Sequence, residues 1–192
     1  MTVVEKAVEF AVKAHEGAKR KSKDRPYILH PLEAMVIVSA LTDDEEIIAA
    51  GILHDITKAL DKPAHLALCK KYGTVLRGFE VENEKLLHSK SGAAVAGGVF
   101  GECQEVVSAI YWHTTGKADM TLLEKIVYMA DYMEPNREFE GVETLRELAW
   151  TDLDRAMLFA FQLSVDILVE RGKAVDEHSL QALEFMKQQL GI

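Results

Sequence analysis

Six side chains of this sequence could bind metal ions. His54 and Asp55 are adjacent at the end of an apolar segment, and four more histidines or aspartates lie in or beside apolar stretches, where a polar group needs a partner. Imidazole and carboxylate groups are common ligands of catalytic divalent metals. The candidate ligands are His30, His54, Asp55, His88, His113 and Asp131.

The adjacency of His54 and Asp55 sets a geometric condition. Neighbouring residues on a regular helix point about 100° apart, so both reach one ion only where the helix end loosens, or where the carboxylate bridges two ions. A bridging Asp55 divides the other candidates into two sets. These sets are His30, His54 and Asp131 for one ion, and His88 and His113 for the other. We therefore predict two divalent ions, and the ligand types favour iron, manganese or zinc over magnesium or calcium.

Helical patterns position these residues. Residues 3–14 place apolar side chains at helical spacing. Pro31 suits the first turn of a helix that continues to Leu41. A capping box at residues 42–45 starts the helix that carries His54. Further helices are predicted over 62–72, 83–99, 102–113, 121–133, 141–149, 152–171 and 177–190.

Two of these later helices have their own start signals, Thr121 with Glu124 and Thr151 with Asp154. No alternating strand pattern competes with the helical one. The sequence contains no repeat or linker-like stretch. We therefore predict an all-α helical bundle that forms a single domain over residues 1–192.

The composition narrows the function classes. The chain has 192 residues, 48% of them hydrophobic, which is typical of a folded globular protein. Its net charge of −9 disfavours nucleic acid and anionic membranes as partners. No segment resembles a signal peptide or a membrane span. Two cysteines are too few for a disulfide scaffold, so we expect a cytoplasmic protein. The sequence leaves a homodimer open.

The order His30, His54-Asp55, Asp131 resembles the H…HD…D arrangement of the HD superfamily of metal-dependent phosphohydrolases, which are all-helical. Over about residues 51–190 the chain is similar to the YqeK family, the bacterial HD-type symmetrical dinucleoside tetraphosphatases. This resemblance implies cleavage of diadenosine tetraphosphate to two ADP with two irons. The segments that carry it are Leu86–Ser89, Ile110–Gly116, Leu122–Ile126, Ala130–Arg137 and Leu145–Ala149.

The first fifty residues resemble a different group. An additional amphipathic helix and the stretch from Arg20 to Leu32 look like the hydrolase domain of the RelA/SpoT guanosine tetraphosphate enzymes. The alternative function is therefore a guanosine tetraphosphate 3′-pyrophosphohydrolase. It needs one ion, bound by the first ligand set with Asp55, and leaves His88 and His113 without a role. A second alternative is a metal-free helical signalling module, against which the complete ligand set argues.

Two cations near the candidate ligands could bind phosphate. Lys58 follows Asp55 by three residues, where the YqeK family has a lysine and the RelA/SpoT enzymes tend to have acidic residues. A lysine there would neutralise charge in the transition state, although a cation at a helix end is the simpler interpretation. The family resemblance also implies that Arg137 binds phosphate, and an exposed salt bridge is its alternative. We predict Asp55 and Lys58 as catalytic residues.

The sequence also contains a turn and a loop whose residues could contact phosphate. Thr114, Thr115, Gly116 and Lys117 could donate hydrogen bonds to phosphate or could simply end a helix. The basic loop 19–25 is interpreted as a solvated charge run. The other histidines are interpreted as structural, and they are His15, His65 and His178.

The predicted mechanism is hydrolysis of a nucleotide polyphosphate. A water molecule activated by two ions attacks a phosphorus atom of the polyphosphate bridge. The ions, Lys58 and Arg137 share the developing charge, and Asp55 bridges the ions and orients the water.

Overall fold

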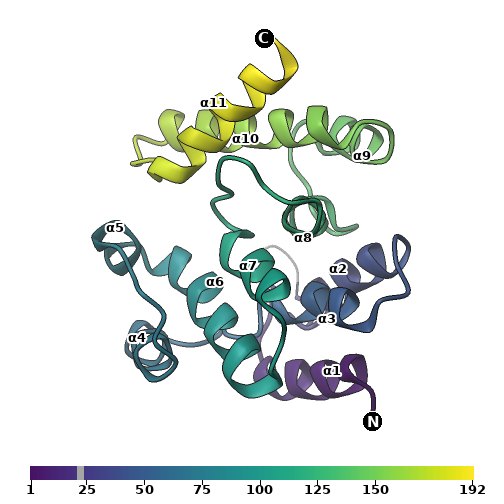
Figure 1. Ribbon diagram of the computed structural model, residues 1–192, viewed down its shortest axis with the longest axis vertical. Helices are drawn as coiled ribbons and strands as arrows, with labels where there is room; N and C mark the ends of the chain where they lie inside the picture. Colours follow the sequence, from purple (N-terminus) through teal and green to yellow (C-terminus); the bar gives the residue numbers. More distant parts are fainter. Residues whose placement is uncertain (21–23) are drawn as a thin grey trace.

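Helices make up the regular structure of the computed structural model, which describes residues 1–20 and 24–192 (Figure 1). Over these residues the chain forms α-helices, one short π-helix and, instead of a sheet, a single isolated bridge between Lys19 and Pro26. This confirms the predicted all-α fold. None of the helices in the described ranges is long and apolar enough to cross a membrane. The helices are α1 (Val3–Ala14), α2 (Leu29–Ser39), α3 (Glu45–Leu53), α4 (Lys62–Lys71), α5 (Gly78–Glu82), α6 (Glu84–Val95), the π-helix η1 (Ala96–Phe100), α7 (Gln104–Trp112), α8 (Leu122–Met133), α9 (Val142–Thr151), α10 (Leu153–Glu170) and α11 (Glu177–Leu190).

Two of the predicted helix starts are wrong by one or two residues. Asp44, not Thr42, caps α3, because the helix begins at Glu45 and the Asp44 carboxylate accepts the backbone N–H of Glu46 at 3.0 Å. Thr151 is the last residue of α9 rather than the cap of α10. Asp152 caps α10 instead, since it directly precedes the helix and its carboxylate accepts the backbone N–H of Arg155 at 3.0 Å.

The start of α8 and the first turn of α2 agree with the sequence. Thr121 and Glu124 form a reciprocal capping box, and Pro31 lies in the first turn of α2. The helix predicted over 83–99 is divided, because α6 ends at Val95 and η1 follows it. The five-residue α5 was missed, since it is too short to show a helical period.

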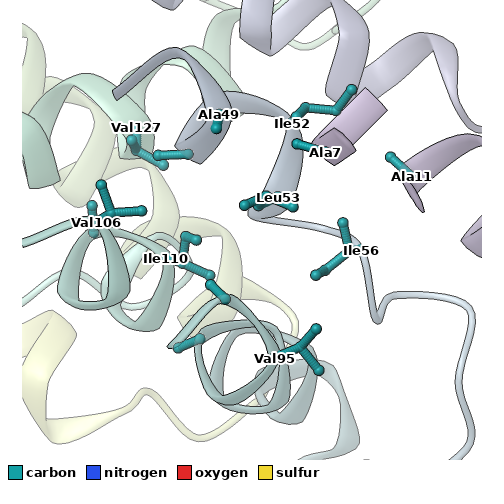
Figure 2. Close-up of a cluster of buried hydrophobic side chains, with 14 residues drawn as sticks. Ala7, Ala11, Ala49, Ile52, Leu53, Ile56, Val95, Val106, Ile110 and Val127 are labelled. Atoms are coloured by element: carbon teal, nitrogen blue, oxygen red, sulfur yellow. The ribbon is translucent and has the colours of Figure 1, made fainter. Parts of the chain in front are cut away.

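Two hydrophobic cores form, one toward each end of the chain. The first packs α1, α3, α6 and α7 together around side chains such as Leu53 and Ile110 (Figure 2), each of which contributes about 2 kcal/mol on burial. The second packs α8 to α11. Helix α8 joins them, because Val127 belongs to the first core and Met129 to the second. In Figure 1, α8 accordingly lies between α1 and the α9–α11 group.

Helices α2 and α3 approach each other unusually closely. A Cβ atom at Gly51 of α3 would lie 2.8 Å from the Cα of Met35 in α2, a distance that real Cβ atoms do not reach. Glycine is therefore required at this contact. The close packing holds His30, on α2, and His54, at the end of α3, on neighbouring elements.

Candidate metal centre

The six predicted ligands meet at one place although five helices supply them or end at them. His54 and His113 are the C-caps of α3 and α7, and Asp55 lies in the turn directly after α3. Their ligand atoms form two groups, each within 4.8 Å, that share Asp55. Cluster A is His30, His54, Asp55 and Asp131, and cluster B is Asp55, His88 and His113.

Cluster A gathers around one oxygen of Asp55. The Nε2 atom of His30 lies 3.2 Å from Asp55 Oδ2 and 2.9 Å from Asp131 Oδ1. The Nε2 atom of His54 lies 3.7 Å and 3.8 Å from the same two oxygens. The two imidazole nitrogens are 3.3 Å apart. All four donor atoms therefore face one small volume.

Cluster B gathers around the other oxygen of Asp55. Oδ1 lies 3.0 Å from Nε2 of His88 and 3.6 Å from Nε2 of His113. These two nitrogens are 3.1 Å apart. One carboxylate thus presents each of its oxygens to a different cluster. The end of α3 makes this possible, because His54 closes the helix and Asp55 has already left it.

Backbone contacts fix two of the imidazole rings. His54 Nδ1 donates to the carbonyl of Gly51 at 2.7 Å, and His113 Nδ1 donates to that of Ile110 at 2.7 Å. Because the Nδ1 proton is used in this way, Nε2 carries a free lone pair directed at the cluster.

Electrostatics set the protonation state of several of these donors. Burial lowers the pKa of His54 to about 3, and burial with the nearby Lys58 ammonium lowers that of His88 to about 4. Burial alone would raise the pKa of Asp55, but Lys58 and the imidazoles hold it well below its usual range. Burial disfavours a charged His30, yet the carboxylates of Asp131 and Asp55 outweigh this and raise its pKa to about 10. Neutral imidazoles and ionised carboxylates are the forms that bind metals. His54, His88 and Asp55 are therefore in the binding form, whereas an ion at cluster A would have to displace the Nε2 proton of His30.

The donor set fits two divalent transition-metal ions. The imidazole nitrogens within each cluster are 3.1 to 3.3 Å apart, close enough for one cation to bind both. A positive charge already stands at cluster B, where Lys58 Nζ donates to His88 Nε2 at 2.9 Å and lies 3.3 Å from Asp55 Oδ1. The pattern expected from the sequence, one carboxylate between two ligand sets, is present in the geometry.

A cavity of about 710 Å³ opens onto both clusters, since His30 and His88 are among its lining residues. Its size is suitable for a small-molecule ligand. The chain as a whole is acidic, so the positive charge at this cavity is local and favours an anionic ligand. The cationic side chains in its lining are Lys19, Arg20, Lys58, Lys85 and Arg137.

Arg137 lies in this lining but is bound to a ligand residue. Its Nη2 donates to Asp131 Oδ1 at 2.5 Å and its Nε to the Asp131 carbonyl at 3.0 Å. The side chain is 37% exposed. Arg137 is therefore more than a surface ion pair, because its guanidinium binds the Asp131 carboxylate of cluster A and also lines the cavity.

The four residues of the 114–117 turn lie outside the cavity lining. The backbone N–H of Gly116 donates to the Trp112 carbonyl at 2.8 Å and ends α7, and Gly116 has a positive φ of 64°. The ammonium of Lys117 lies 3.1 Å from Glu124. These contacts give phosphate binding at the turn no support. The residues concerned are Thr114, Thr115, Gly116 and Lys117.

The interpretation of loop 19–25 as solvated is wrong for Arg20. Its side chain is only 9% exposed and its guanidinium pairs with the buried carboxylate of Glu134. Arg25 also has a partner, the Asn136 side chain at 2.9 Å. Residues 21–23 of this loop lie outside the described ranges. The N-terminal segment therefore contacts the region just after α8.

Sequence reasoning missed several residues next to the clusters. Tyr27 donates its hydroxyl to Asp55 Oδ2 at 2.5 Å and lines the cavity. Lys90 is fully buried and donates to the Tyr111 carbonyl at 2.9 Å, which ties α6 to α7 beside their histidines. Tyr27 precedes His30 by three residues and Lys90 follows His88 by two, so proximity to a ligand was the available signal.

The histidines interpreted as structural have different surroundings. His65 donates to or accepts from Ser91 Oγ at 2.7 Å, and it also lines the cavity. His178 contacts Arg77 and stacks on Trp112, away from both clusters. His15 is buried against the Tyr27 ring.

An all-helical fold whose histidines and aspartates form two clusters on a shared aspartate is the arrangement of a metal-dependent hydrolase. Residues 27–136 match the HD domain family. A symmetrical bis(5'-nucleosyl)-tetraphosphatase from Halalkalibacterium halodurans is 35% identical over 134 residues, which cover 69% of this chain and 71% of that protein. The Staphylococcus aureus protein of the same description is 30% identical over 186 residues, covering 90% and 92%. The chain belongs to the HD domain family.

A solved structure supports the same conclusion. The crystal structure of a predicted HD superfamily hydrolase involved in NAD metabolism, from Clostridium acetobutylicum, matches with a TM-score of 0.83 at 31% identity, over 96% of this chain and 97% of that one. A shorter stretch is 42% identical to a GTP pyrophosphokinase of Myxococcus xanthus over 55 residues, 29% of this chain and 7% of that protein. Because the Staphylococcus relative covers 90% of the chain, similarity to the tetraphosphatases extends into the first fifty residues.

Proposed function

We propose that this protein hydrolyses dinucleoside tetraphosphates symmetrically, converting diadenosine tetraphosphate to two ADP. The observation that carries the proposal is the division of the Asp55 carboxylate between clusters A and B. A centre for two ions at the base of a cation-lined cavity suits a substrate with a highly charged phosphate bridge. The names of the two tetraphosphatase relatives support this choice of substrate.

The six cluster residues are the proposed ligands, with Asp55 shared. Iron is the expected metal, and manganese and zinc are the alternatives. Two such ions supply Lewis acidity, which neutralises phosphoryl charge and lowers the pKa of water toward 7.

The balanced reaction consumes one water molecule. The water oxygen forms a bond to one of the two central phosphorus atoms, and the bond from that phosphorus to the central bridging oxygen breaks. Each half departs as a nucleoside diphosphate, and the two protons of the water are released when both new terminal phosphates are fully ionised. Asp55, which lies in the turn after α3 and contacts the cavity-lining residues His30 and His88, is proposed to orient the water as well as to hold the ions.

Lys58 and Arg137 are proposed to stabilise the charge that develops during cleavage. Both line the cavity and both already pair with carboxylates of the clusters, Lys58 with Asp55 and Arg137 with Asp131. A fixed cation at the point where charge develops stabilises the transition state more than the substrate. Their guanidinium and ammonium groups are the chain's own contribution to that stabilisation.

The second candidate is a guanosine tetraphosphate 3′-pyrophosphohydrolase, for which the short GTP pyrophosphokinase match is the supporting observation. It would use cluster A alone. Two observations favour the first candidate. Cluster B would have no role in a one-ion reaction, and Thr57-Lys58 offers no acidic side chain after the His54-Asp55 pair. The hydroxyl of Thr57 is moreover occupied by the His88 carbonyl at 2.8 Å.

A nucleotide panel tests the proposal. Protein reloaded with iron or manganese is incubated with diadenosine tetraphosphate and with guanosine tetraphosphate, and the products are separated by chromatography. ADP alone is expected from the first substrate. AMP with ATP, or activity only on guanosine tetraphosphate, would refute the proposal, and inactivity toward every nucleotide with no bound metal would indicate the non-catalytic module. We also infer a cytoplasmic location, which two free cysteines and an acidic chain support.

A further inference from the structure

His30 is held differently from the other cluster histidines. The Nδ1 atoms of His54 and His113 donate to backbone carbonyls at 2.7 Å. His30 Nδ1 is buried and has no hydrogen bond among the described residues. Oε1 of Glu134, an acceptor, lies 3.4 Å from it. The carboxylate of Glu134 is completely buried.

We propose that Glu134 is the positioning residue for His30, and that Arg20 of the N-terminal segment fixes Glu134 in turn. The proposal rests on the proposed metal centre, because it gives these residues a role in holding one of its ligands. Neither Glu134 nor Arg20 is one of the six cluster residues.

The contacts of Glu134 support a positioning role. Arg20 Nη2 donates to Oε1, the oxygen that faces His30, and the backbone N–H of Asn136 donates to Oε2 at 2.6 Å. Both carboxylate oxygens are thus fixed. Arg146 donates to the Glu134 carbonyl at 2.8 Å and holds the backbone as well. A buried carboxylate with this many partners is ionised and rigid.

Glu134 is placed to orient the ring and not to bind the ion itself. It faces Nδ1 of His30, whereas Nε2 faces Asp55 and Asp131 on the opposite side of the ring. A carboxylate at Nδ1 keeps the proton there, leaves Nε2 bare and makes the imidazole a stronger donor. Loss of such a partner typically weakens metal binding 10- to 100-fold.

The same contacts give the N-terminal segment a function in this centre. Arg20 and Glu134 are 114 residues apart in sequence, and Arg20 is 9% exposed in the pair. Without its cation, the Glu134 carboxylate would be buried with less compensation and would not keep its position. Substitution of Arg20 should therefore weaken the same metal site from a distance.

The test is zinc affinity, measured by competition with a chromophoric chelator on chelator-stripped full-length protein. His113→Ala is used as the background because it leaves only cluster A complete. In this background Glu134→Ala should lower zinc affinity 10- to 100-fold, and Glu134→Gln, whose carbonyl can still accept from Nδ1, should lower it only about threefold. Arg20→Gln should lower it about threefold to tenfold, and adding Arg20→Gln to Glu134→Ala should have no further effect.

Glu124→Gln is the matched control. Glu124 is a buried glutamate of α8, the helix whose C-cap is Glu134, and it pairs with Ser108 and Lys117 rather than with a cluster residue. Zinc affinity in this variant should stay within twofold. Circular dichroism reports whether each variant is folded. If Glu134→Ala does not fold, the zinc affinities of Glu134→Gln and Arg20→Gln test the proposal.

Unchanged zinc affinity in folded Glu134→Ala, or an equal loss in Glu124→Gln, would overturn the proposal while leaving the proposed function intact. If His113→Ala binds no zinc at all, the ligand assignment fails and both proposals fall. Zinc-loaded protein gives an independent readout, because the His30 Nδ1 proton should be visible by NMR in the wild type and lost through exchange in Glu134→Ala.

Discussion

Clusters A and B share one aspartate but are built on different supports. Cluster A has two carboxylates, and charged groups outside the cluster contact two of its residues. Arg137 pairs with Asp131, and Glu134 lies beside His30. Cluster B has one carboxylate oxygen, two neutral imidazoles and a lysine ammonium already within it. A cation therefore gains more charge compensation in cluster A and must displace Lys58 in cluster B. The comparison teaches that a shared ligand does not make two sites equivalent.

The largest effect is expected at the residue common to both clusters. Asp55→Ala should remove both ions and lower kcat by at least about 10³-fold, because no other carboxylate joins the two ligand sets. Elemental analysis and turnover of diadenosine tetraphosphate measure the two effects. His178→Gln is the control, since His178 lies away from both clusters, and its metal content and turnover should match the wild type. Retention of one ion by Asp55→Ala would show that the clusters are independent.

Lys58→Ala, unlike Asp55→Ala, should lower activity without loss of either metal ion. It should lower kcat about 10²-fold, because a fixed cation at the site of developing charge is lost. Cluster A should keep its ion, and cluster B should bind its ion more tightly because the competing ammonium is gone. Steady-state kinetics and metal titration separate these outcomes. Weaker metal binding at cluster B would mean that Lys58 supports the ligands instead of competing with the ion.

Stepwise metal removal tests whether cluster A binds its ion more tightly than cluster B. Increasing concentrations of chelator should remove the cluster B ion first, and we expect the two dissociation constants to differ by about tenfold, or about 1.4 kcal/mol. Activity should fall with loss of the first ion. His88→Ala protein, which lacks a cluster B ligand, should retain one ion under the same conditions. Simultaneous loss of both ions at every chelator concentration would contradict the comparison.

The smallest expected effect is on the pH dependence of stability, and it arises from Glu102, a carboxyl group outside both clusters. Burial, with the charges of Glu46 and Asp44, raises the pKa of Glu102 from 4.5 to about 7. Between these pH values the folded protein keeps a proton that the unfolded chain loses, so the contribution of Glu102 to stability falls as pH rises. Glu102→Gln should be more stable than wild type by about 1 kcal/mol at pH 8, after allowance for its partial exposure, and equal to it near pH 4. Thermal unfolding at both pH values measures this, and equal stabilities at pH 8 would contradict it.

Local patterns explain what the sequence could predict. Helix α8 was predictable because Thr121 and Glu124 form its capping box and apolar residues follow at helical spacing. The six cluster residues could be proposed as ligands because each is a polar residue in an apolar setting, and because the His54-Asp55 pair resembles a family motif. The exact caps were less predictable, since adjacent polar side chains can each accept a backbone N–H, as Thr42 does from Asp44 and Asp44 does from Glu46.

Contacts across long separations explain what the sequence could not predict. Tyr27 meets Asp55 across 28 residues, and Arg20 meets Glu134 across 114. No periodicity connects such positions, so Arg20 resembled any other residue of a basic loop. For the 114–117 turn, the hydroxyl, glycine and lysine residues predict phosphate binding, and this stays a prediction. The contacts that the structure shows there are the end of α7 and an ion pair with Glu124.

Gly51 has a consequence for the choice of metal ion. Its single hydrogen atom allows α2 and α3 to approach, and its carbonyl fixes the ring of His54. A methyl group there would push Met35 away and carry His30 with it, which would widen the opening between the two imidazole nitrogens. The ionic radius that the proposed site would accept therefore depends on a glycine outside the ligand set, and a single carbon atom added at residue 51 should shift the preference toward larger cations.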